Sequence, residues 1–402
     1  MPQISEKPAS ELGLSVTIPC RNEPEVLRTL TALQNCDLPR CAVEVLILIN
    51  DTASDVSSVS AQNVSSFEQI KNFAAQNNTD RLRFFPLYFT KMSKKQSGVG
   101  TARKIAMDEA IYRFAQAENP QGIITGLDAD TLVQPNYLTT VCDYFDKNPK
   151  CPAANIYYEH PTEGENFSPE HYAAIVTYEL HLRLYVHALR RAGLPVARQT
   201  VGSAMAVRAK DYAAQGGMPR KKAGEDFYFL HKFTQSPHFG EITGTTVIPS
   251  PRISDRVPFG TGKAVGDMLS GKTFLTHHPQ SYADLQQFLS RVNEWYTDDL
   301  EAKERQLPES VRAFLREENF TEKLQEIKTN VSSLPAFRKR FFAWFDAFRA
   351  MKYVHFVRDN FYPDLPVGEA AAQWLGVAEG QSEKQLLRLF READKKRRSM
   401  KI

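Results

Sequence analysis

Short apolar runs alternate with amphipathic stretches along the first half of this chain. Nearly continuous apolar runs, typical of strands buried on both faces of a parallel sheet, fill residues 14–19, 43–49, 82–87 and 123–127. Helical spacing of apolar residues fills the intervals at 24–34, 65–76 and 100–117, with Pro24 suited to a first helical turn. This alternation predicts βαβ units, and therefore a mostly parallel, Rossmann-like α/β sheet flanked by helices.

The second half of the chain has a different pattern. We expect helices over 169–191, 209–214 and 225–233, and a return to the sheet over 199–207. Residues 248–262 are rich in Pro, Gly, Ser and Arg, which predicts a loop too long for a simple connector. From residue 282 onward the pattern is helical, and the aromatic side chains of 337–348 repeat at three- and four-residue spacing, which is typical of a helix docked on a core. We therefore expect an α/β catalytic domain at 12–280 and a helical C-terminal extension at 281–402.

Composition narrows the class of protein. The chain has 402 residues, 42% hydrophobic and 24% charged, with a net charge of +3, which is too small to favour nucleic acid as a partner. No stretch approaches the ~18 apolar residues of a membrane span, and the N-terminus lacks the apolar core of a secretory signal. Five cysteines without metal-ligand spacing fit a reduced, cytoplasmic compartment. The basic end at 395–398 is either a solvated tail or a source of weak attraction to an anionic inner membrane surface, a peripheral contact.

The sequence Gly126-Leu-Asp-Ala-Asp130 follows the fourth predicted strand. Two carboxylates one residue apart at the carboxyl end of a strand can both point into the crevice where open α/β sheets bind ligands. Mg²⁺ and Mn²⁺ prefer oxygen ligands, often one or two carboxylates together with substrate phosphates. Asp128 and Asp130 are therefore predicted to hold a metal and a diphosphate, and the alternative is a solvated turn.

Four groups of short motifs follow one another along the chain. They lie at 17–23, at 50–55, at 98–104 with 128–130, and at 202–208 with 216–218 and 224–226. This order and spacing resemble the family 2 glycosyltransferases, over about residues 12–265. The resemblance implies a GT-A fold and a transferase of the hexosyltransferase type (EC 2.4) that uses a nucleotide-diphospho-sugar donor.

The resemblance also implies roles for individual residues on the donor side. Asp51 matches the carboxylate that accepts from the N3–H of uracil, although a helix cap or turn is an equal alternative from the residue alone. Pro19, Arg21 and Glu23 would line the nucleoside side of the crevice. Arg103 would contact base or phosphate at a helix start, unless it is a surface cation. Asp128 and Asp130 would hold Mg²⁺ or Mn²⁺ as the cofactor.

The acceptor side depends on the Glu225-Asp226 pair. Asp226 matches the base that deprotonates the acceptor hydroxyl in inverting members, and Glu225 is its partner or an acceptor-binding group. The structural alternative is that both acids only cap the following helix. Arg252 and Arg256, in the predicted loop, suit contact with the diphosphate, and solvated loop charges are the alternative.

The chain also departs from the family pattern. Residues 50–53 read Asn-Asp-Thr-Ala where two acids and a glycine are usual, which leaves the preferred base open. The Gln-x-x-Arg-Trp motif of processive members is absent from the sequence, which favours single transfer. The alternatives are a sugar-phosphate nucleotidyltransferase, a non-catalytic nucleotide-sugar-binding protein, and a retaining outcome. The acceptor hydroxyl could belong to a glycan, a lipid-linked molecule or a small molecule.

Overall fold

The structure is a computed structural model that describes residues 2–93, 97–221, 223–254, 256, 258–297, 300–378 and 380–396. The chain divides into two compact units. The first, the sheet unit, comprises Met1–Pro161, Thr200–Lys263 and the chain from Asp394. The second, the helical unit, comprises Thr162–Gln199 and Ala264–Ala393.

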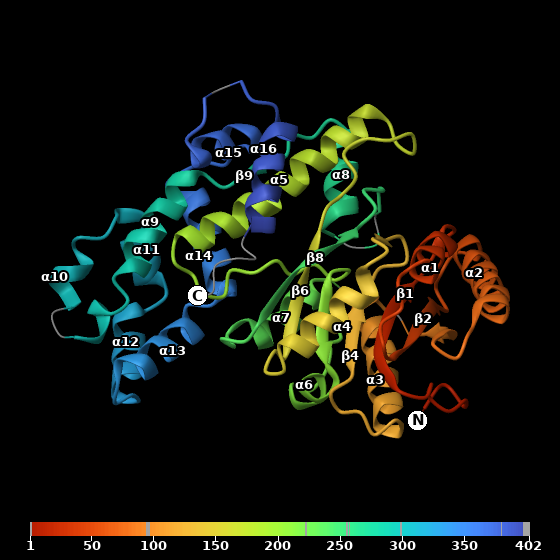
Figure 1. Ribbon diagram of the computed structural model, residues 1–402. Coiled ribbons are helices and arrows are strands. Elements are labelled where there is room, and N and C mark those ends of the chain that lie inside the picture. Colours follow the sequence, from red (N-terminus) through yellow and green to blue (C-terminus); the bar gives the residue numbers. More distant parts are fainter. Residues whose placement is uncertain are drawn as a thin grey trace. The chain divides into compact units, whose positions relative to one another are not determined.

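An eight-stranded sheet forms the centre of the sheet unit (Figure 1). In chain order its strands are β1 (Leu12–Cys20), β2 (Ala42–Thr52), β3 (Leu82–Met92), β4 (Ile123–Gly126), β5 (Leu132–Val133), β6 (Ala153–Tyr158), β7 (Met205–Arg208) and β8 (Gly240–Ile248). Their spatial order is β3-β2-β1-β4-β7-β6-β8-β5. Strands β3, β2, β1 and β4 run parallel, and β7 is antiparallel to both β4 and β6. This mostly parallel sheet confirms the predicted α/β, GT-A-like fold.

The parallel strands form because their side chains are buried on both faces. Val16 of β1 pairs in register with Val45 of β2, and all of β2 is buried. Strand β2 continues through Asn50, Asp51 and Thr52, which corrects the predicted turn at these residues: pairing with β3 keeps them extended. Likewise, β3 continues to Met92, beyond the predicted end at residue 87.

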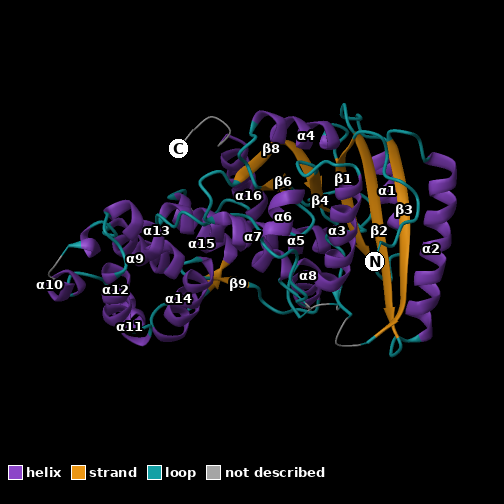
Figure 2. Cartoon of the chain, turned by 90° about the horizontal axis from the view of Figure 1, so that it is seen from below, coloured by secondary structure: helices purple, strands orange, loops and turns teal. Residues whose placement is uncertain are grey.

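Two sets of helices cover the sheet, as the purple helices in Figure 2 show. Helices α1 (Val26–Gln34), α2 (Ser57–Asn77) and α4 (Tyr137–Lys147) share one apolar core with the sheet. Helices α3 (Val99–Gln116), α6 (Ala209–Ala214) and α7 (Glu225–Thr234) share a second core. Alternate strand residues enter the two cores, as Val45 and Ile47 do on one side and Leu46 and Leu48 on the other. The sheet is therefore a buried middle layer.

The helical unit is built on the long helix α5 (Pro169–Arg191) and the C-terminal helices. The further elements from residue 261 onward are α8 (Thr261–Leu269), β9 (Leu275–Thr276), α9 (Pro279–Ser290), η1 (Glu294–Tyr296), α10 (Leu300–Glu304), α11 (Glu309–Glu317), α12 (Phe320–Thr329), α13 (Leu334–Trp344), α14 (Ala347–Asn360), β10 (Leu365–Pro366), α15 (Val367–Leu375) and α16 (Glu383–Lys396). Phe288 lies at the centre of an aromatic core, with its ring 5.4–5.8 Å from those of Trp295, Phe320, Phe341 and Phe345. The predicted helical C-terminal region is confirmed, and its aromatic run is core.

The compact units do not follow the predicted boundary at 280/281. Residues 162–199 and 264–280 group with the C-terminal helices, because α5 supplies part of their apolar cores. The division into a catalytic domain at 12–280 and an extension at 281–402 stays a prediction about function.

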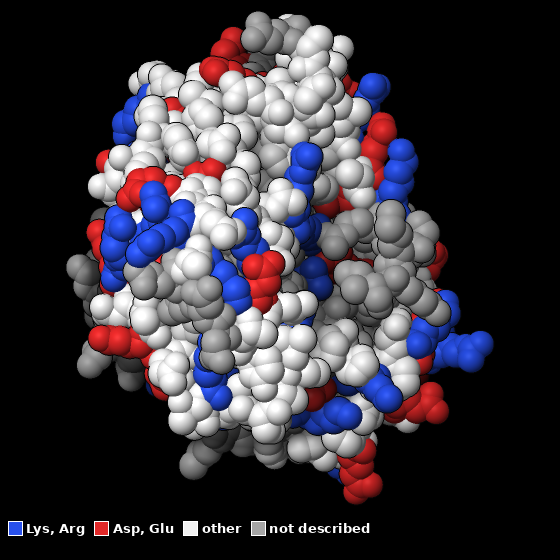
Figure 3. Space-filling view, turned by 90° about the vertical axis from the view of Figure 1, so that its left-hand side faces the viewer, with Lys and Arg blue, Asp and Glu red and all other residues white. Residues whose placement is uncertain are grey.

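Charges on the described surface are mixed. On the face shown in Figure 3, basic side chains occur in small groups beside acidic ones. Lys395 of the basic end is not free: its Nζ lies 2.7 Å from Glu159 Oε1 and 5.1 Å from the Tyr157 ring centroid. Arg397 and Arg398 lie outside the described residues. Of the helices described, none has the length and apolar character needed to cross a membrane.

Candidate active site of the sheet unit

Asp128 and Asp130 follow the carboxyl end of β4. Leu127 and Ala129 point into the core beneath them, so the alternation along the chain turns the two aspartates outward. Their side chains are 39% and 19% exposed. A hydrogen bond from Thr131 N to Asp128 O, 3.1 Å long, closes the turn. Both carboxylates therefore lie at the sheet edge where they were predicted.

Arg103, in the first turns of α3, is buried and binds three separate segments. Its Nη2 donates to Asp128 Oδ1 at 2.5 Å, its Nε to Glu225 Oε1 at 2.9 Å, and its Nη1 to the carbonyl of Gly202 at 3.0 Å. The guanidinium is thus occupied by protein groups and is 97% inaccessible, which rules out the surface-cation reading.

Two glycines make room for this guanidinium. A Cβ on Gly202 would lie 2.7 Å from Arg103 Nη2, and a Cβ on Gly126 would lie 3.2 Å from Nη1. At Gly100, one turn earlier on α3, a Cβ would lie 2.2 Å from the carbonyl of Lys221. Glycine at these positions lets three backbone segments close around Arg103, a function that the motif spacing alone did not reveal.

Glu225 and Asp226 begin α7, after Gly224 in the left-handed conformation (φ +68°). Glu225 is buried against Arg103, whereas Asp226 is partly exposed. Asp226 Oδ1 accepts from the backbone N–H of Phe227 at 2.7 Å. Its Oδ2 faces Gly202, where a Cβ would approach within 3.2 Å.

The pKa of Asp226 is raised to about 7. Partial burial of the carboxyl group is the largest cause, and repulsion by Glu225 adds to it, while Arg103 acts in the opposite direction. A carboxyl group with this pKa can change its protonation state near neutral pH, as a general base must.

Arg252, in the loop after β8, joins two acids. It donates through Nε to Asp130 Oδ2 and through Nη2 to Glu23 Oε2. Burial raises the pKa of Glu23, and Arg252 partly offsets this effect. Arg256 Nη1 donates to the carbonyl of Arg21 at 2.8 Å. The structure therefore brings the predicted loop arginines to the predicted nucleoside residues.

Asp51 lies in β2 and is held by β3. Its Oδ2 accepts from the Tyr88 hydroxyl at 2.7 Å, and its Oδ1 accepts from the backbone N–H of Lys91 at 2.8 Å. Neither the helix cap nor the turn anticipated as an alternative is its role. The sequence analysis did not identify Tyr88 as a partner of Asp51. Its aromatic side chain lies in a strand-like apolar run, and nothing in that pattern indicates a hydrogen bond to a carboxylate.

Arg21 and Pro19 complete this side of the site. Arg21 Nη2 donates to Asp55 Oδ1 at 2.6 Å. Hydrogen bonds from Thr52 and Arg21 outweigh burial and lower the pKa of Asp55, which keeps it ionised. Pro19 lies in β1, paired with Leu48 of β2, and is partly exposed.

The donor set at Asp128 and Asp130 fits a divalent cation. Each carboxylate uses one oxygen for an arginine, and the hydrogen bonds between described residues leave Asp128 Oδ2 and Asp130 Oδ1 without a donor. Two carboxylates with water and phosphate oxygens make a suitable hard-cation site. Among the described residues, no group of three or more His, Cys, Asp or Glu side chains is arranged to hold a metal.

Comparisons with known proteins agree with the resemblance in motifs. Residues 15–214 match the family model described as Glycosyl transferase family 2. A search of curated proteins gave no match.

Solved structures similar to this chain include S. aureus TarS 1-349. That structure has a TM-score of 0.39 and 14% identity, with 96% of this chain and 88% of that chain covered. The same protein in complex with UDP-GlcNAc has a TM-score of 0.41 and 15% identity, with 92% and 93% covered. The family model matches residues 15–214. Together with the fold and the order of the motifs, this match shows that the chain belongs to the family 2 glycosyltransferases.

Proposed function

We propose that this protein transfers a single sugar from a UDP-sugar to an acceptor hydroxyl, with inversion at the anomeric carbon and with a divalent metal. Family membership provides glycosyl transfer from a nucleotide-sugar. The observation that carries the mechanism is Asp226, a carboxyl group of pKa about 7. It follows Glu225, which accepts from Arg103, and the same guanidinium donates to Asp128.

On the donor side, Asp128 and Asp130 would hold Mg²⁺ or Mn²⁺. The bound ion would neutralise charge that develops on the leaving diphosphate. Arg252 would then exchange its contact with Asp130 for the diphosphate, since a guanidinium suits bidentate phosphate binding. Arg256 is in the same loop and would assist.

The nucleoside would lie against Pro19, Arg21, Glu23 and Asp51. Tyr88 and the Lys91 N–H fix the orientation of the Asp51 carboxylate. Because each carboxylate oxygen has two lone pairs, Asp51 retains capacity to accept from the N3–H of uracil.

On the acceptor side, Asp226 would accept the proton of the hydroxyl whose oxygen attacks the anomeric carbon. The bond between that carbon and the diphosphate oxygen breaks, and the nucleoside diphosphate leaves. Glu225 accepts from Arg103, so we assign it to orientation of the pair and to raising the pKa of Asp226. Asp226 alone carries the proton.

The competing enzyme class is disfavoured. A sugar-phosphate nucleotidyltransferase was the alternative, and the family match supports glycosyl transfer in its place. A non-catalytic binder has no need of a carboxyl group tuned to pKa about 7 beside a metal-type carboxylate pair. Retention of configuration at the anomeric carbon is the alternative to inversion, and the stereochemistry of the product would distinguish the two.

Thermal shift with a panel of nucleotide-sugars tests this proposal. A ligand that binds only the native state stabilises it by about 2.7 kcal/mol at a hundred times its Kd. We expect UDP-sugars with Mn²⁺ to raise Tm more than GDP-, ADP- or dTDP-sugars, and EDTA to abolish the shift. A larger shift with another base, or one that is unchanged by EDTA, would contradict the UDP or the metal assignment respectively.

A further inference from the structure

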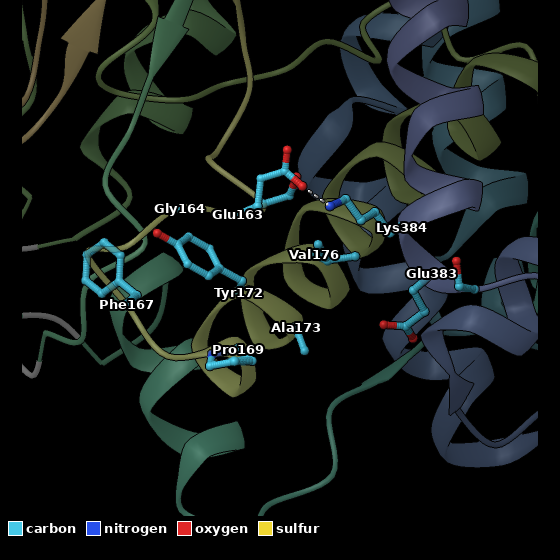
Figure 4. Close-up of a pocket in the computed structure, with 11 residues that line it drawn as sticks. Glu163, Gly164, Phe167, Pro169, Tyr172, Ala173, Val176, Glu383 and Lys384 are labelled. Carbon is cyan, nitrogen blue, oxygen red and sulfur yellow. Dashed lines mark hydrogen bonds and ion pairs between the residues drawn. The ribbon is translucent and has the colours of Figure 1, made fainter.

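A cavity of about 590 Å³ lies in the helical unit, between the first turns of α5 and the start of α16 (Figure 4). Its walls are mostly apolar, with Phe167 and Tyr172 among them. The Tyr172 hydroxyl lies against Gly164, where a Cβ would come within 2.8 Å of it. The described side chains of this cavity therefore indicate no particular ligand. Two thiols in the sheet unit have a more definite chemistry.

The thiols of Cys41 and Cys142 are in contact. Their sulfur atoms lie 3.8 Å apart, although the residues are 101 positions apart in the sequence. Cys41 directly precedes β2, Cys142 lies in α4, and both pack in the core that α1, α2 and α4 share with the sheet. A disulfide bond has a sulfur–sulfur distance of about 2.05 Å, so the two atoms must approach by a further ~1.8 Å to form one.

The backbone of β1 holds the Cys41 side chain in this position. A Cβ on Gly13 would lie 2.5 Å from Cys41 Cβ and 2.6 Å from Cys41 Sγ, so the side chain occupies space that a glycine leaves free. Gly13 lies where the register between β1 and β2 shifts, between Leu12 and Leu14. The Cys41 thiol is therefore confined between β1 and α4.

The two thiols differ in reactivity. Cys41 is partly exposed, whereas Cys142 is 7% exposed. A hydrogen bond with Cys142 lowers the pKa of Cys41, although burial acts in the opposite direction. The same hydrogen bond, together with burial, raises the pKa of Cys142. Because the thiolate is the reactive form of cysteine, Cys41 is the nucleophile of the pair and Cys142 is the second thiol beside it.

The other three cysteines lack these features. Cys20, Cys36 and Cys151 are buried, and burial raises their pKa values to about 12, 11 and 11. All five cysteines lie in the described part of the chain, and the one sulfur–sulfur contact among them joins Cys41 to Cys142. Cysteines that respond to oxidation are typically accessible, low in pKa and next to a second thiol. Cys41 meets these conditions.

We propose that Cys41 and Cys142 form a reversible disulfide in the presence of a hydroperoxide, and that this bond joins α4 covalently to the start of β2. The Cys41 thiolate attacks one oxygen of hydrogen peroxide, the O–O bond breaks, and the hydroxide that leaves takes up a proton to become water. The Cys142 sulfur then attacks the sulfur of the resulting sulfenic acid, the S–O bond breaks, and the hydroxyl leaves as water with the Cys142 proton. The two sulfur atoms together lose two electrons, which reduce one peroxide to two waters, and a reducing thiol reverses the reaction.

The disulfide lies away from the candidate active site. Cys41 is at the amino end of β2, whereas Asp51 is near the other end, roughly 30 Å away along an extended strand. The inference is therefore independent of the proposed function, and either can fail without the other.

Peptide mapping of the full chain tests the disulfide. The reduced protein is treated with a small excess of hydrogen peroxide, the remaining thiols are blocked with iodoacetamide, and a non-reducing digest is analysed by mass spectrometry. We expect one cross-linked peptide pair, Cys41 with Cys142, that dithiothreitol separates, and three alkylated cysteines. The absence of a cross-link, or a cross-link from Cys41 to a different cysteine, would overturn the proposal.

Two buried cysteines of the same core provide a matched pair of variants. Cys36 and Cys142 are each 7% exposed. In Cys142→Ala no second thiol is next to Cys41, so we expect peroxide to leave Cys41 as a sulfenic acid that dimedone labels. Cys36→Ala should form the cross-link as the wild type does, without this label. Equal labelling of Cys41 in the two variants would overturn the role of Cys142. If circular dichroism shows that Cys142→Ala is misfolded, Cys142→Ser replaces it, with the same expectation.

The melting temperature tests the covalent connection of α4. A bond between residues 101 positions apart restricts the unfolded chain more than the folded one. We expect oxidation to raise the Tm of the wild type by roughly 5 °C or more, and to leave the Tm of Cys142→Ala unchanged. A cross-linked protein with the Tm of the reduced form would overturn the connection of α4 to β2 as a stabilising bond.

Discussion

Arg103 Nη2 lies 2.5 Å from Asp128 Oδ1, and the same buried guanidinium donates to Glu225. Arg103 therefore connects Asp128, a predicted metal ligand, to Glu225 of the predicted catalytic pair, although the two acids are far apart in the sequence. Removal of one member of a buried ion pair leaves its partner uncompensated, at a cost of roughly 3–5 kcal/mol. We therefore propose that Arg103 positions these acids, as an alternative to the donor-binding role that its motif suggested.

Arg103→Lys tests this positioning. A lysine keeps the charge, but its three N–H donors share one nitrogen, whereas Arg103 reaches its three partners from three different nitrogens of a planar guanidinium. We expect kcat to fall at least tenfold and Tm to decrease, with a smaller change in KM for the donor. Arg28→Lys, at an exposed position in α1, is the control and should have wild-type values. A large increase in KM for the donor with unchanged kcat would contradict this role and would indicate that Arg103 binds the donor.

Arg252→Gln should change metal affinity before any nucleotide is added. The guanidinium occupies one oxygen of Asp130, so it competes with a cation for that carboxylate. We expect Mn²⁺ alone, measured by electron paramagnetic resonance, to bind several-fold more tightly to Arg252→Gln, and UDP to bind more weakly in the presence of Mn²⁺. Arg256→Gln is the control for the Mn²⁺ measurement, because Arg256 contacts the Arg21 carbonyl and not Asp130. It is not a control for UDP, since Arg256 is proposed to assist in diphosphate binding. Unchanged Mn²⁺ affinity in Arg252→Gln would mean that Asp130 is not a metal ligand.

The rate of transfer should depend on the ionisation of Asp226. Its pKa is raised to about 7, so the carboxyl is protonated below that pH and unable to accept a proton. Single-turnover rates should therefore rise with pH through about 7 and level off above it. Glu225→Gln removes a negative neighbour that raises this pKa, so the midpoint should move to lower pH. A midpoint that is unaffected by Glu225→Gln would assign the titration to another group.

The framework of the fold could be predicted because its signals are local. Strands β1 and β2 are nearly continuous apolar runs, and α5 has the predicted bounds, with Ser168 as its cap and Pro169 in its first turn. Strands β6 and β8 were missed, since β8 carries glycine and threonine in place of an apolar run. Helix α4 was also missed, although its buried residues recur at helical spacing and provided the signal.

The sequence predicted which motifs form the candidate site, but it did not predict the hydrogen bonds between their residues. The positions of Asp128, Asp130 and Asp226 after strands or at a helix start follow from the sequence. The contacts between Arg252 and Glu23, and between Arg103 and Glu225, join residues 229 and 122 positions apart, and no local pattern reports such pairs. Burial, which dominates the pKa shift of Asp226, likewise appears only in the folded chain.

The aromatic core of the helical unit should be required for its stability. Phe288 is fully buried among four aromatic rings, whereas Phe348, on α14, is 38% exposed. Phe288→Ala should lower the free energy of unfolding by about 3–5 kcal/mol, and Phe348→Ala should change it little, as denaturant titration would measure. A chain ending at Gln280 should aggregate, because the end of α5 packs into this core. A soluble, fully active truncated protein would contradict both the structural role and any part in acceptor binding.

The most direct test of the mechanism is single-turnover sugar transfer by Asp226→Asn. The amide is nearly isosteric with the carboxyl but cannot accept the proton, so UDP-sugar affinity should stay close to that of the wild type. The rate of transfer should fall by roughly a hundredfold or more, the usual effect of losing a positioned base. Asp143→Asn, at an exposed position in α4, should have the wild-type rate. Transfer by Asp226→Asn at the wild-type rate would contradict the assignment of Asp226 as the base.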